Sequence, residues 1–207
     1  MKNRILFTLS LMICSLYLFG QTEEAPFEKK WNFNADANNY FFPDDYFFLP
    51  VFKADKNKLH LEARYNYEDM ETFSGWVGYN FNGGDEFEYT FTPMLGGVVG
   101  LSNGIVPGLE MTLTYKNFEL YSEMENLFDL GERENDFYYN WTDLTYSPTD
   151  WLWLGISGQR TRLYQTDVEI QRGLILGGGF KQWELTSYFY NLDIENPFFL
   201  VTISVGF

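Results

Sequence analysis

The sequence predicts an all-β chain that folds as a single antiparallel β-barrel. Segments in which every second residue is apolar recur from residue 31 to the last residue, and turn-forming Asn, Asp, Gly and Pro separate them. No helical periodicity of useful length appears after residue 20. The 207 residues, 20% of them aromatic, provide one domain of ordinary size.

The first twenty residues have the pattern of a secretory signal peptide. Met1–Arg4 is basic, Ile5–Phe19 is almost uninterruptedly apolar, and Gly20 precedes the polar Gln21. The apolar run is shorter than the ~20 residues of a transmembrane helix, so we expect cleavage near Gly20. The expected organisation is a signal peptide at 1–20, a flexible lead-in at 21–30 and a β-barrel domain at 31–207.

The charge and cysteine content exclude several classes of site and partner. The formal net charge is −15, which disfavours nucleic acid and anionic lipid as partners. The single cysteine, Cys14, lies in the expected signal peptide. The mature chain is therefore expected to form no disulfide and no cysteine metal site.

The first half of the barrel domain contains six expected strands. Residues 31–42 alternate before Pro43-Asp44-Asp45, and 46–53 form a less regular strand in which Pro50 suits an edge or a bulge. Ala54–Asn57 is an expected turn. The clearer strands are 58–68, 73–81, the segment from Phe87 toward the glycine-rich Leu95–Gly100, and 109–115. Asn82–Asp85 is a hairpin signal.

The second half contains six more expected strands. Lys116-Asn117 allows a tight reversal into 118–125, and Asn126–Asp136 is the longest polar connection. The following expected strands are 137–146, 151–162, 167–180, 183–190 and 198–207. We expect bulges or close strand approach at Gly96-Gly97, Gly100 and Gly177–Gly179, because no helix follows these glycines to form a phosphate site.

The last strand carries the most specific pattern. Phe199, Val201, Ile203, Val205 and Phe207 share one apolar face, and the opposite face is mainly polar. A chain that ends on such a strand and on a terminal Phe resembles the small outer-membrane β-barrels of Gram-negative bacteria, of Bacteroidota type. The resemblance implies an outer-membrane location, surrounding lipid as a partner, and Phe207 as a signal to the barrel-assembly machinery.

The strand number and the connections agree with that resemblance. Twelve strands are expected, or ten if residues 31–53 contain none, and an even number places both termini on the periplasmic side. Alternate connections then put the long Asn126–Asp136 outside. The compact Asn82–Asp85, Lys116-Asn117, Ser147–Asp150 and Lys181-Gln182 fall inside, as in known transmembrane barrels.

The face expected to line the barrel is unusually acidic. The candidate lumen or binding residues are His60, Glu62, Arg64, Trp76, Glu88, Glu110, Glu119, Tyr121, Glu123, Glu125, Trp153, Glu169, Arg172, Glu184 and Tyr188. One interpretation is a plug in which arginines neutralise the glutamates. The other is a wet, cation-preferring lumen that passes or binds a small solute.

Three arginines do not fit the alternation of outward apolar and inward polar residues. Simple counting places Arg160, Arg162 and Arg172 on the lipid face, where arginine at mid-membrane costs about 2–4 kcal/mol. A bulge at Gly158 or Gly173 would turn them inward. We expect Arg172 to point inward, and Arg160 and Arg162 to lie at the outer rim, where they can meet lipopolysaccharide phosphates.

The sequence favours a structural or narrow-channel barrel that is monomeric and not an enzyme. No cofactor or metal is expected, because one histidine among scattered glutamates shows no recognisable ligand spacing. One alternative is a barrel enzyme that uses His60 on lipid or peptide, although His60-Leu61-Glu62 matches neither an Asp-x-His nor a His-x-Ser pair. Another alternative is a soluble secreted β-protein that binds an apolar ligand.

Overall fold

The computed structural model describes residues 30–131, 133–163, 169–193 and 197–207, with the side chains between 161 and 169 outside the described set. In this part of the chain the strands form one antiparallel sheet. The strands are β1 (Asn32–Phe41), β2 (Tyr46–Lys56), β3 (Leu59–Tyr65), β4 (Phe73–Tyr79), β5 (Phe81–Gly83), β6 (Phe87–Val99), β7 (Gly104–Tyr115), β8 (Phe118–Asp129), β9 (Phe137–Thr149), β10 (Leu152–Leu163), β11 (Glu169–Phe180), β12 (Trp183–Tyr190) and β13 (Phe198–Gly206), and a 3-10 turn, η1 (Arg133–Asn135), precedes β9.

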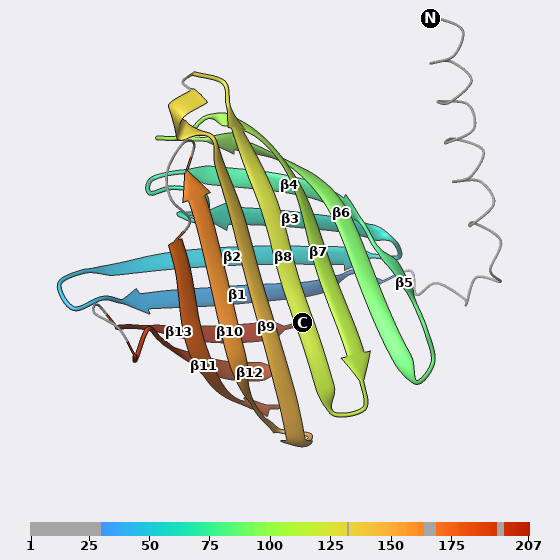
Figure 1. Cartoon of the computed structure of the whole chain (residues 1–207). Helices are drawn as coiled ribbons and strands as arrows, with labels where there is room; N and C mark the ends of the chain where they lie inside the picture. The colour runs from blue at the N-terminus through green and yellow to red at the C-terminus, as the bar shows by residue number, and fades with distance from the viewer. Residues whose placement is uncertain (1–29, 132, 164–168, 194–196) are drawn as a thin grey trace, which may run out of the picture.

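The sheet closes on itself as a twelve-stranded barrel within the described residues. β4 and β5 both pair with β6 and are one strand interrupted at Asn80. Each strand pairs with the next in sequence, and β1 pairs with β13 to close the barrel. Figure 1 shows β6–β10 crossing in front of β1–β4 as two walls of the barrel. The all-β, twelve-strand prediction is confirmed.

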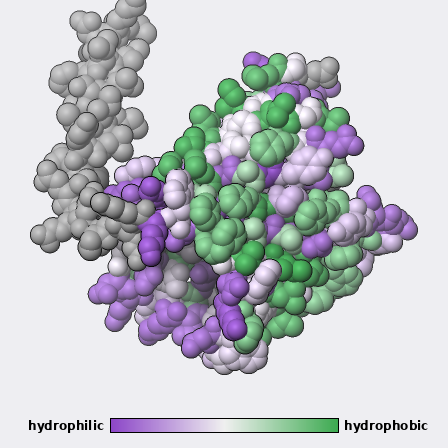
Figure 2. Space-filling view, turned by 180° about the vertical axis from the view of Figure 1, so that it is seen from behind, coloured by the Kyte–Doolittle hydropathy of each residue, from purple (hydrophilic) through white to green (hydrophobic). Residues whose placement is uncertain are grey.

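The two faces of each strand differ as the alternation requires. Outward residues are apolar and exposed, for example Leu174 and Leu176 on β11, whereas Ile175 between them is buried. Figure 2 shows apolar residues spread over the visible outer face, with hydrophilic residues gathered toward its edges. Such a wide exposed apolar surface is unstable in water and suits a hydrocarbon environment.

The connections differ in length between the two ends of the barrel. The end that carries residues 42–45, 66–72, 100–103 and 130–136 is called the long-loop end. The opposite, short-turn end carries 57–58, 84–86, 116–117, 150–151 and 181–182, and β1 begins and β13 ends there. Among the described residues, no helical segment is long and apolar enough to cross a membrane.

Several strand bounds and two expected bulges differ from the sequence prediction. β7 begins at Gly104 rather than near Leu109, β3 already ends at Tyr65, and β8 and β9 continue to Asp129 and Thr149 into the expected connections. β2 continues through Asp55 to Lys56, so the turn before β3 is Asn57-Lys58, with Asn57 at a φ of 57°. No bulge occurs at Gly158 or Gly173, because the β10–β11 register runs without a shift from Leu152 to Thr161. Pro50 is accommodated because the β2–β3 ladder begins one residue later, at Val51.

The barrel interior is packed by two clusters of buried side chains. One contains Tyr40, Leu49, Val51, Trp141, Tyr190, Phe198 and Leu200, and the other contains Trp76, Met94, Val98, Val106 and Leu127. The Trp76 ring fits because Gly96 faces it: a Cβ at Gly96 would lie 2.5 Å from the ring. Gly96 therefore marks close approach of a side chain rather than a bulge.

Candidate functional site: the acidic interior

A cavity of about 470 Å³ occupies the interior between mid-barrel and the short-turn end. We call it the vestibule. At mid-barrel its lining includes Arg64, Tyr67 and Trp141, and toward the short turns it includes Ser147 and Asp150. The lining side chains come from β1, β2, β3, β8, β9, β10, β11, β12 and β13, so most of the barrel wall contributes.

The vestibule is strongly acidic. Among the described residues, the carboxylates that line it are Asp36, Glu62, Glu119, Glu123, Asp143, Asp150 and Glu184, and the cations are Lys53 and Arg64. Asp143 is held in place, because its carboxylate accepts from Trp141 Nε1 at 2.6 Å and from the Tyr188 hydroxyl at 3.1 Å. Glu119 and Glu184, nearer the short turns, are exposed. The unbalanced negative charge favours cations in this space.

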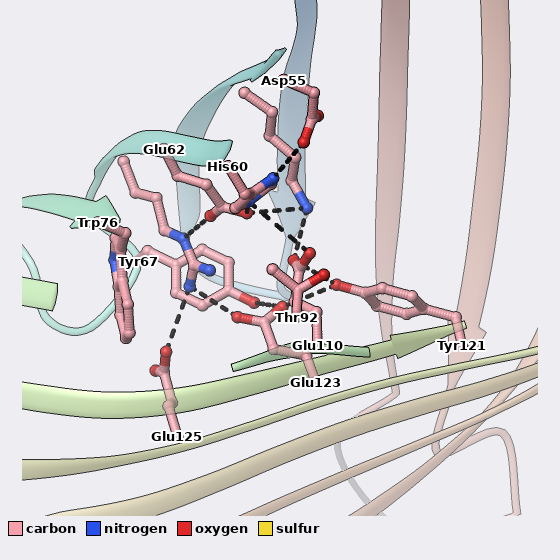
Figure 3. A network of polar contacts seen from close by, with 12 residues as sticks. Asp55, His60, Glu62, Tyr67, Trp76, Thr92, Glu110, Tyr121, Glu123 and Glu125 are labelled. Carbon is pink, nitrogen blue, oxygen red and sulfur yellow. Dashed lines mark hydrogen bonds and ion pairs between the residues drawn. The ribbon is translucent and has the colours of Figure 1, made fainter. Parts of the chain in front are cut away.

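A buried ion network lies at the inner end of the vestibule. Arg64 on β3 donates from Nε to Glu62 at 2.6 Å and from Nη1 to Glu123 on β8 at 2.6 Å. Glu125 also accepts from Nη1, at 3.2 Å. Because β3 and β8 are not neighbours in the sheet, these bonds cross the inside of the barrel. Figure 3 shows Glu62 and Glu123 converging on this point from opposite walls.

Two aromatic rings enclose the Arg64 guanidinium. Its carbon lies 4.3 Å from the Tyr67 ring centroid and 4.6 Å from that of Trp76. A desolvated cation against aromatic faces gains a cation–π contribution in addition to its ion pairs. Arg64 is only 2% exposed, so this arrangement fixes it rigidly.

A second cationic centre forms beside the first. Lys53 on β2 donates to Glu110 on β7 at 2.6 Å and lies 3.3 Å from Glu62. His60 Nε2 lies 2.7 Å from the same Glu62 carboxylate, and Nδ1 lies 2.8 Å from Asp55. Lys53, His60 and Arg64 thus share Glu62, which is buried and lies within ion-pair distance of all three.

The loop 66–72 folds over the network at the long-loop end. Its Tyr67 hydroxyl donates to Glu123 at 2.7 Å, and Glu68 accepts from Ser74 Oγ at 2.6 Å and from Trp76 Nε1 at 3.2 Å. Burial raises the pKa of Glu68 above its ordinary value of 4.5, and the charge of Arg64 opposes that shift. Burial likewise raises the pKa of Tyr67.

Stacked aromatic rings fill the interior beyond the network. Tyr40 stacks on Phe47 at 4.5 Å between centroids, and Phe198 stacks on Tyr190 at 4.7 Å and on Phe42 at 4.8 Å. Phe42, Phe47 and Phe198 belong to strand ends or a loop at the long-loop end. The network and this aromatic cluster together narrow the interior between the vestibule and the long loops.

The structure brings together most of the residues predicted for the lumen. The vestibule lining includes Glu62, Arg64, Glu119, Tyr121, Glu123, Trp153, Glu184 and Tyr188. His60, Trp76, Glu110 and Glu125 are buried in or against the ion network.

Two predicted site residues lie away from this site, and a third is not described. Glu88 is exposed and lines a separate surface hollow with Glu86, Thr114 and Lys116. The side chain of Glu169 lies outside the described set. The inward orientation of Arg172 was wrong: Arg172 follows the outward alternation of Ile170 and Leu174, and it pairs with Asp193 at 3.1 Å.

The other arginine predictions have separate outcomes. Arg160 is exposed on the outer face, in line with Leu154 and Ile156. The side chain of Arg162 lies outside the described set.

Sequence reasoning missed Lys53 and Asp143, which are central to the interior. Lys53 follows the apolar stretch Tyr46–Phe52, where both faces are hydrophobic, so the alternation gave no clear inward side. Leu49, Val51 and Lys53 are alternate residues of one strand and therefore share a face. Assigning the face of Leu49 and Val51 to the interior would have placed Lys53 inside as well. Asp143 shares the face of Trp141 and Thr145, and this pattern was available in the sequence.

Among the described residues, His60, Glu62 and Glu110 form a cluster with metal-ligating atoms within 4.8 Å of one another. Lys53 already contributes its ammonium to both glutamates of the cluster. A metal ion there would have to displace this lysine, because both cations need the same carboxylate oxygens. His60 contacts Asp55 and Glu62 through its two ring nitrogens, and this places it within the ion network.

Comparison with known proteins supports the fold. The sequence matches no family model and no curated protein. Its structure is similar to that of the KdgM porin, with a TM-score of 0.62 at 13% identity over 84% of this chain and 99% of that one. The KdgM porin in complex with disordered oligogalacturonate gives a TM-score of 0.63 at 12% identity, again over 84% and 99% of the two chains. The outer membrane protein Omp33 of Acinetobacter baumannii gives 0.52 at 12% identity, over 86% and 99%. The chain therefore has the fold of a small outer-membrane porin.

Proposed function

We propose that this protein is a narrow outer-membrane channel whose acidic vestibule admits small neutral and cationic solutes. The observation that carries the proposal is the vestibule of about 470 Å³, with seven carboxylates and two cations among the described residues of its lining. Its size suits a small solute, and its charge concentrates cations relative to anions. The Arg64 network and the aromatic cluster at Phe198 form the constriction on the long-loop side.

The solute class of the similar porin does not carry over to this chain. Oligogalacturonate, with which the KdgM porin forms a complex, bears carboxylates. An anion entering this vestibule would meet Glu119, Asp143 and Glu184 before it reached a buried cation. Electrostatics therefore favours neutral or positively charged solutes here.

The proposed location follows from the fold and the N-terminal pattern. We propose that residues 1–20 are a cleaved signal peptide, that residues 21–30 are a periplasmic lead-in, and that the short-turn end faces the periplasm of a Gram-negative cell. The chain then folds as a monomer in the outer membrane after delivery to the barrel-assembly machinery, which would read Phe207. Phe207 is exposed and stacks on Phe33 at 5.6 Å, so it is accessible at the short-turn end.

Single-channel recording of the refolded mature protein in a planar bilayer tests the proposed function. We expect a small, cation-selective conductance at two salt concentrations. Glu119→Gln with Glu184→Gln should lower the cation preference, because both carboxylates lie in the vestibule. Glu134→Gln, in the exposed turn η1, is the matched control and should leave selectivity unchanged. A folded barrel that stays silent, or one whose selectivity ignores the vestibule carboxylates, would contradict the proposal.

A further inference from the structure

Trp153 forms an aromatic part of the vestibule wall. It pairs with Gly177 across the β10–β11 ladder, and a Cβ at Gly177 would overlap its indole ring. The ring therefore lies over the backbone of β11 at a position without a side chain, and it lines the vestibule. Gly179 extends this position, because a Cβ there would lie 3.6 Å from the ring. The glycine run on β11 thus provides the space in which the indole lies against the wall.

A carboxylate side chain lies beside the Trp153 ring. Glu184 on β12 pairs with Gly179, and a Cβ at Gly179 would lie 3.7 Å from Glu184 Cγ as well as 3.6 Å from Trp153 Cζ3. The indole and the glutamate side chain therefore approach the same point on the wall. Glu184 is exposed and lines the vestibule, so a solute that enters from the short-turn end can reach it.

Glu119 on β8 and Asp143 on β9 add two more carboxylates to this region of the vestibule. Glu119 pairs with Thr145, so Asp143 is its diagonal neighbour, at a Cβ separation of about 7–8 Å. The negative charges of Glu184 and Asp143 both act on Glu119. The three carboxylates are therefore close enough to contact different parts of one small molecule.

No ion pair neutralises Glu119, Asp143 or Glu184 within the described part of the chain. Lys53 and Arg64, the cations of the lining, form their ion pairs in the buried network instead. Asp143 is only 7% exposed. Its hydrogen-bond donors are all neutral: Trp141 Nε1, Ser157 Oγ and the Tyr188 hydroxyl. These donors fix the carboxylate at the cavity surface and leave its charge to attract a mobile cation.

The spacing of these carboxylates suits an extended cation better than a single metal ion. Among the described residues, the one group of three or more potential ligands with atoms within 4.8 Å of one another is at the ion network, around His60. Glu119, Asp143 and Glu184 therefore do not converge on one point. An aliphatic diamine carries an ammonium group at each end of an apolar chain, and a chain of four carbons reaches between carboxylates at this spacing.

We propose that the vestibule binds a linear aliphatic diamine, with its ammonium groups on Asp143, Glu119 and Glu184 and its methylene chain on the Trp153 indole. The ring stabilises both the apolar chain and the ammonium group beside it. This inference rests on the proposed function and deepens it, because it names an organic dication as the solute. The cavity of about 470 Å³ accommodates such a molecule together with water.

Isothermal titration calorimetry of the refolded mature protein in neutral detergent tests the site. The probe is 1,4-diaminobutane at pH 7, where both amines are protonated, and 1,4-butanediol is the uncharged comparison molecule with the same carbon chain. We expect the diamine to bind about ten-fold more tightly than the diol. Mg²⁺, a dication without a carbon chain, should not displace the diamine at equal concentration.

Two variants remove the two parts of the site separately. Glu119→Gln with Glu184→Gln should abolish the preference for the diamine over the diol. Both side chains are exposed, so the variant should fold, and heat-modifiable gel mobility checks this. Trp153→Leu should weaken diamine binding by about five-fold, because the carboxylates remain but the indole face is lost.

The matched controls change the same types of side chain outside the vestibule. Glu86→Gln with Glu88→Gln removes two exposed carboxylates from a separate hollow at the same end of the barrel. Trp151→Leu removes an indole that is 60% exposed. Both controls should keep the wild-type affinity for the diamine. An equal loss in either control, or displacement by Mg²⁺ at equal concentration, would overturn the site.

Conductance separates this inference from the channel proposal. A folded barrel that binds the diamine but conducts no ions would contradict the channel alone. A cation-selective conductance together with equal affinities for the diamine and the diol would overturn the diamine site alone.

Discussion

Arg64 on β3 donates to Glu123 on β8 at 2.6 Å across the inside of the barrel, although the two strands are not neighbours in the sheet. The bond joins two walls that the backbone ladder does not connect directly. Glu62 and Glu125 complete the shell of carboxylates around the same guanidinium. The Arg64 side chain therefore both links two walls of the barrel and narrows its interior.

Removing Arg64 should strongly destabilise the barrel. In Arg64→Met the side chain keeps much of its volume, but Glu62, Glu123 and Glu125 lose a shared buried cation. Breaking a buried ion pair from one side costs about 3–5 kcal/mol. Urea unfolding of the refolded protein, followed by tryptophan fluorescence, measures the change.

The control for this prediction is Arg172→Met. The Arg172–Asp193 pair is exposed, so its loss should cost about 0–1 kcal/mol. Equal destabilisation by the two substitutions would mean that the buried network contributes no more than a surface pair.

The interior aromatic cluster should limit conductance. Phe198 is 2% exposed and stacks within the barrel on Tyr190, whereas its neighbour Phe199 points outward. Phe198→Ala should raise single-channel conductance, because it removes a ring from the constriction. Phe199→Ala deletes an identical ring from the outer face of the same strand and should leave conductance unchanged. A Phe198→Ala barrel with wild-type conductance would place the constriction elsewhere.

The strands were predictable because a closed barrel imposes a period of two on every one of them. A strand between lipid and interior must alternate, as Lys58–Glu68 and Phe199–Phe207 do in the sequence. The pattern failed at Tyr46–Phe52, where the inner residues Phe47, Leu49 and Val51 are as apolar as the outer ones and pack on Tyr40 and its neighbours. Lys53 was missed for that reason.

The partners of the interior charges could not be predicted from alternation. Alternation places His60, Glu62 and Arg64 on one face, but it does not specify which opposite wall they meet. Lys53–Glu110 and Arg64–Glu123 each join strands that are four positions apart around the barrel, a pairing set by the shape of the closed sheet. Arg172 was assigned inward to avoid lipid, although its position beside the end of β12 already removes it from mid-membrane.

Adjacent glycines on β6 should differ sharply in their tolerance of a methyl group. A Cβ on Gly96 would lie 2.5 Å from the Trp76 ring, which is held between Arg64 and the buried cluster, whereas a Cβ on Gly97 would meet nothing within 4 Å. Gly96→Ala should destabilise by about 1–3 kcal/mol through overpacking. Gly97→Ala should lie within about 0.5 kcal/mol of wild type. Urea midpoints of the two variants check this, and equal values would contradict the packing of Trp76 against β6.

Glu68 should make the stability of the barrel depend on pH. Its Oε2 atom is buried without a hydrogen-bond partner, and burial raises the pKa of this carboxyl above 4.5. A carboxyl with a raised pKa in the folded state holds its proton more tightly there than in the unfolded chain. Its contribution is fully present below pH 4.5 and is lost as the pH rises through the folded-state pKa.

Glu68→Gln should remove this part of the pH dependence. The neutral amide cannot ionise, so the variant should gain stability relative to wild type as the pH rises through that window. Glu71→Gln, an exposed change in the same loop, should leave the pH dependence of the urea unfolding midpoint the same as in wild type. Urea unfolding midpoints from pH 4 to pH 8 distinguish the two. If Glu68→Gln instead lost stability relative to wild type at neutral pH, the carboxylate would be the favoured form, held by Arg64 more strongly than burial opposes it.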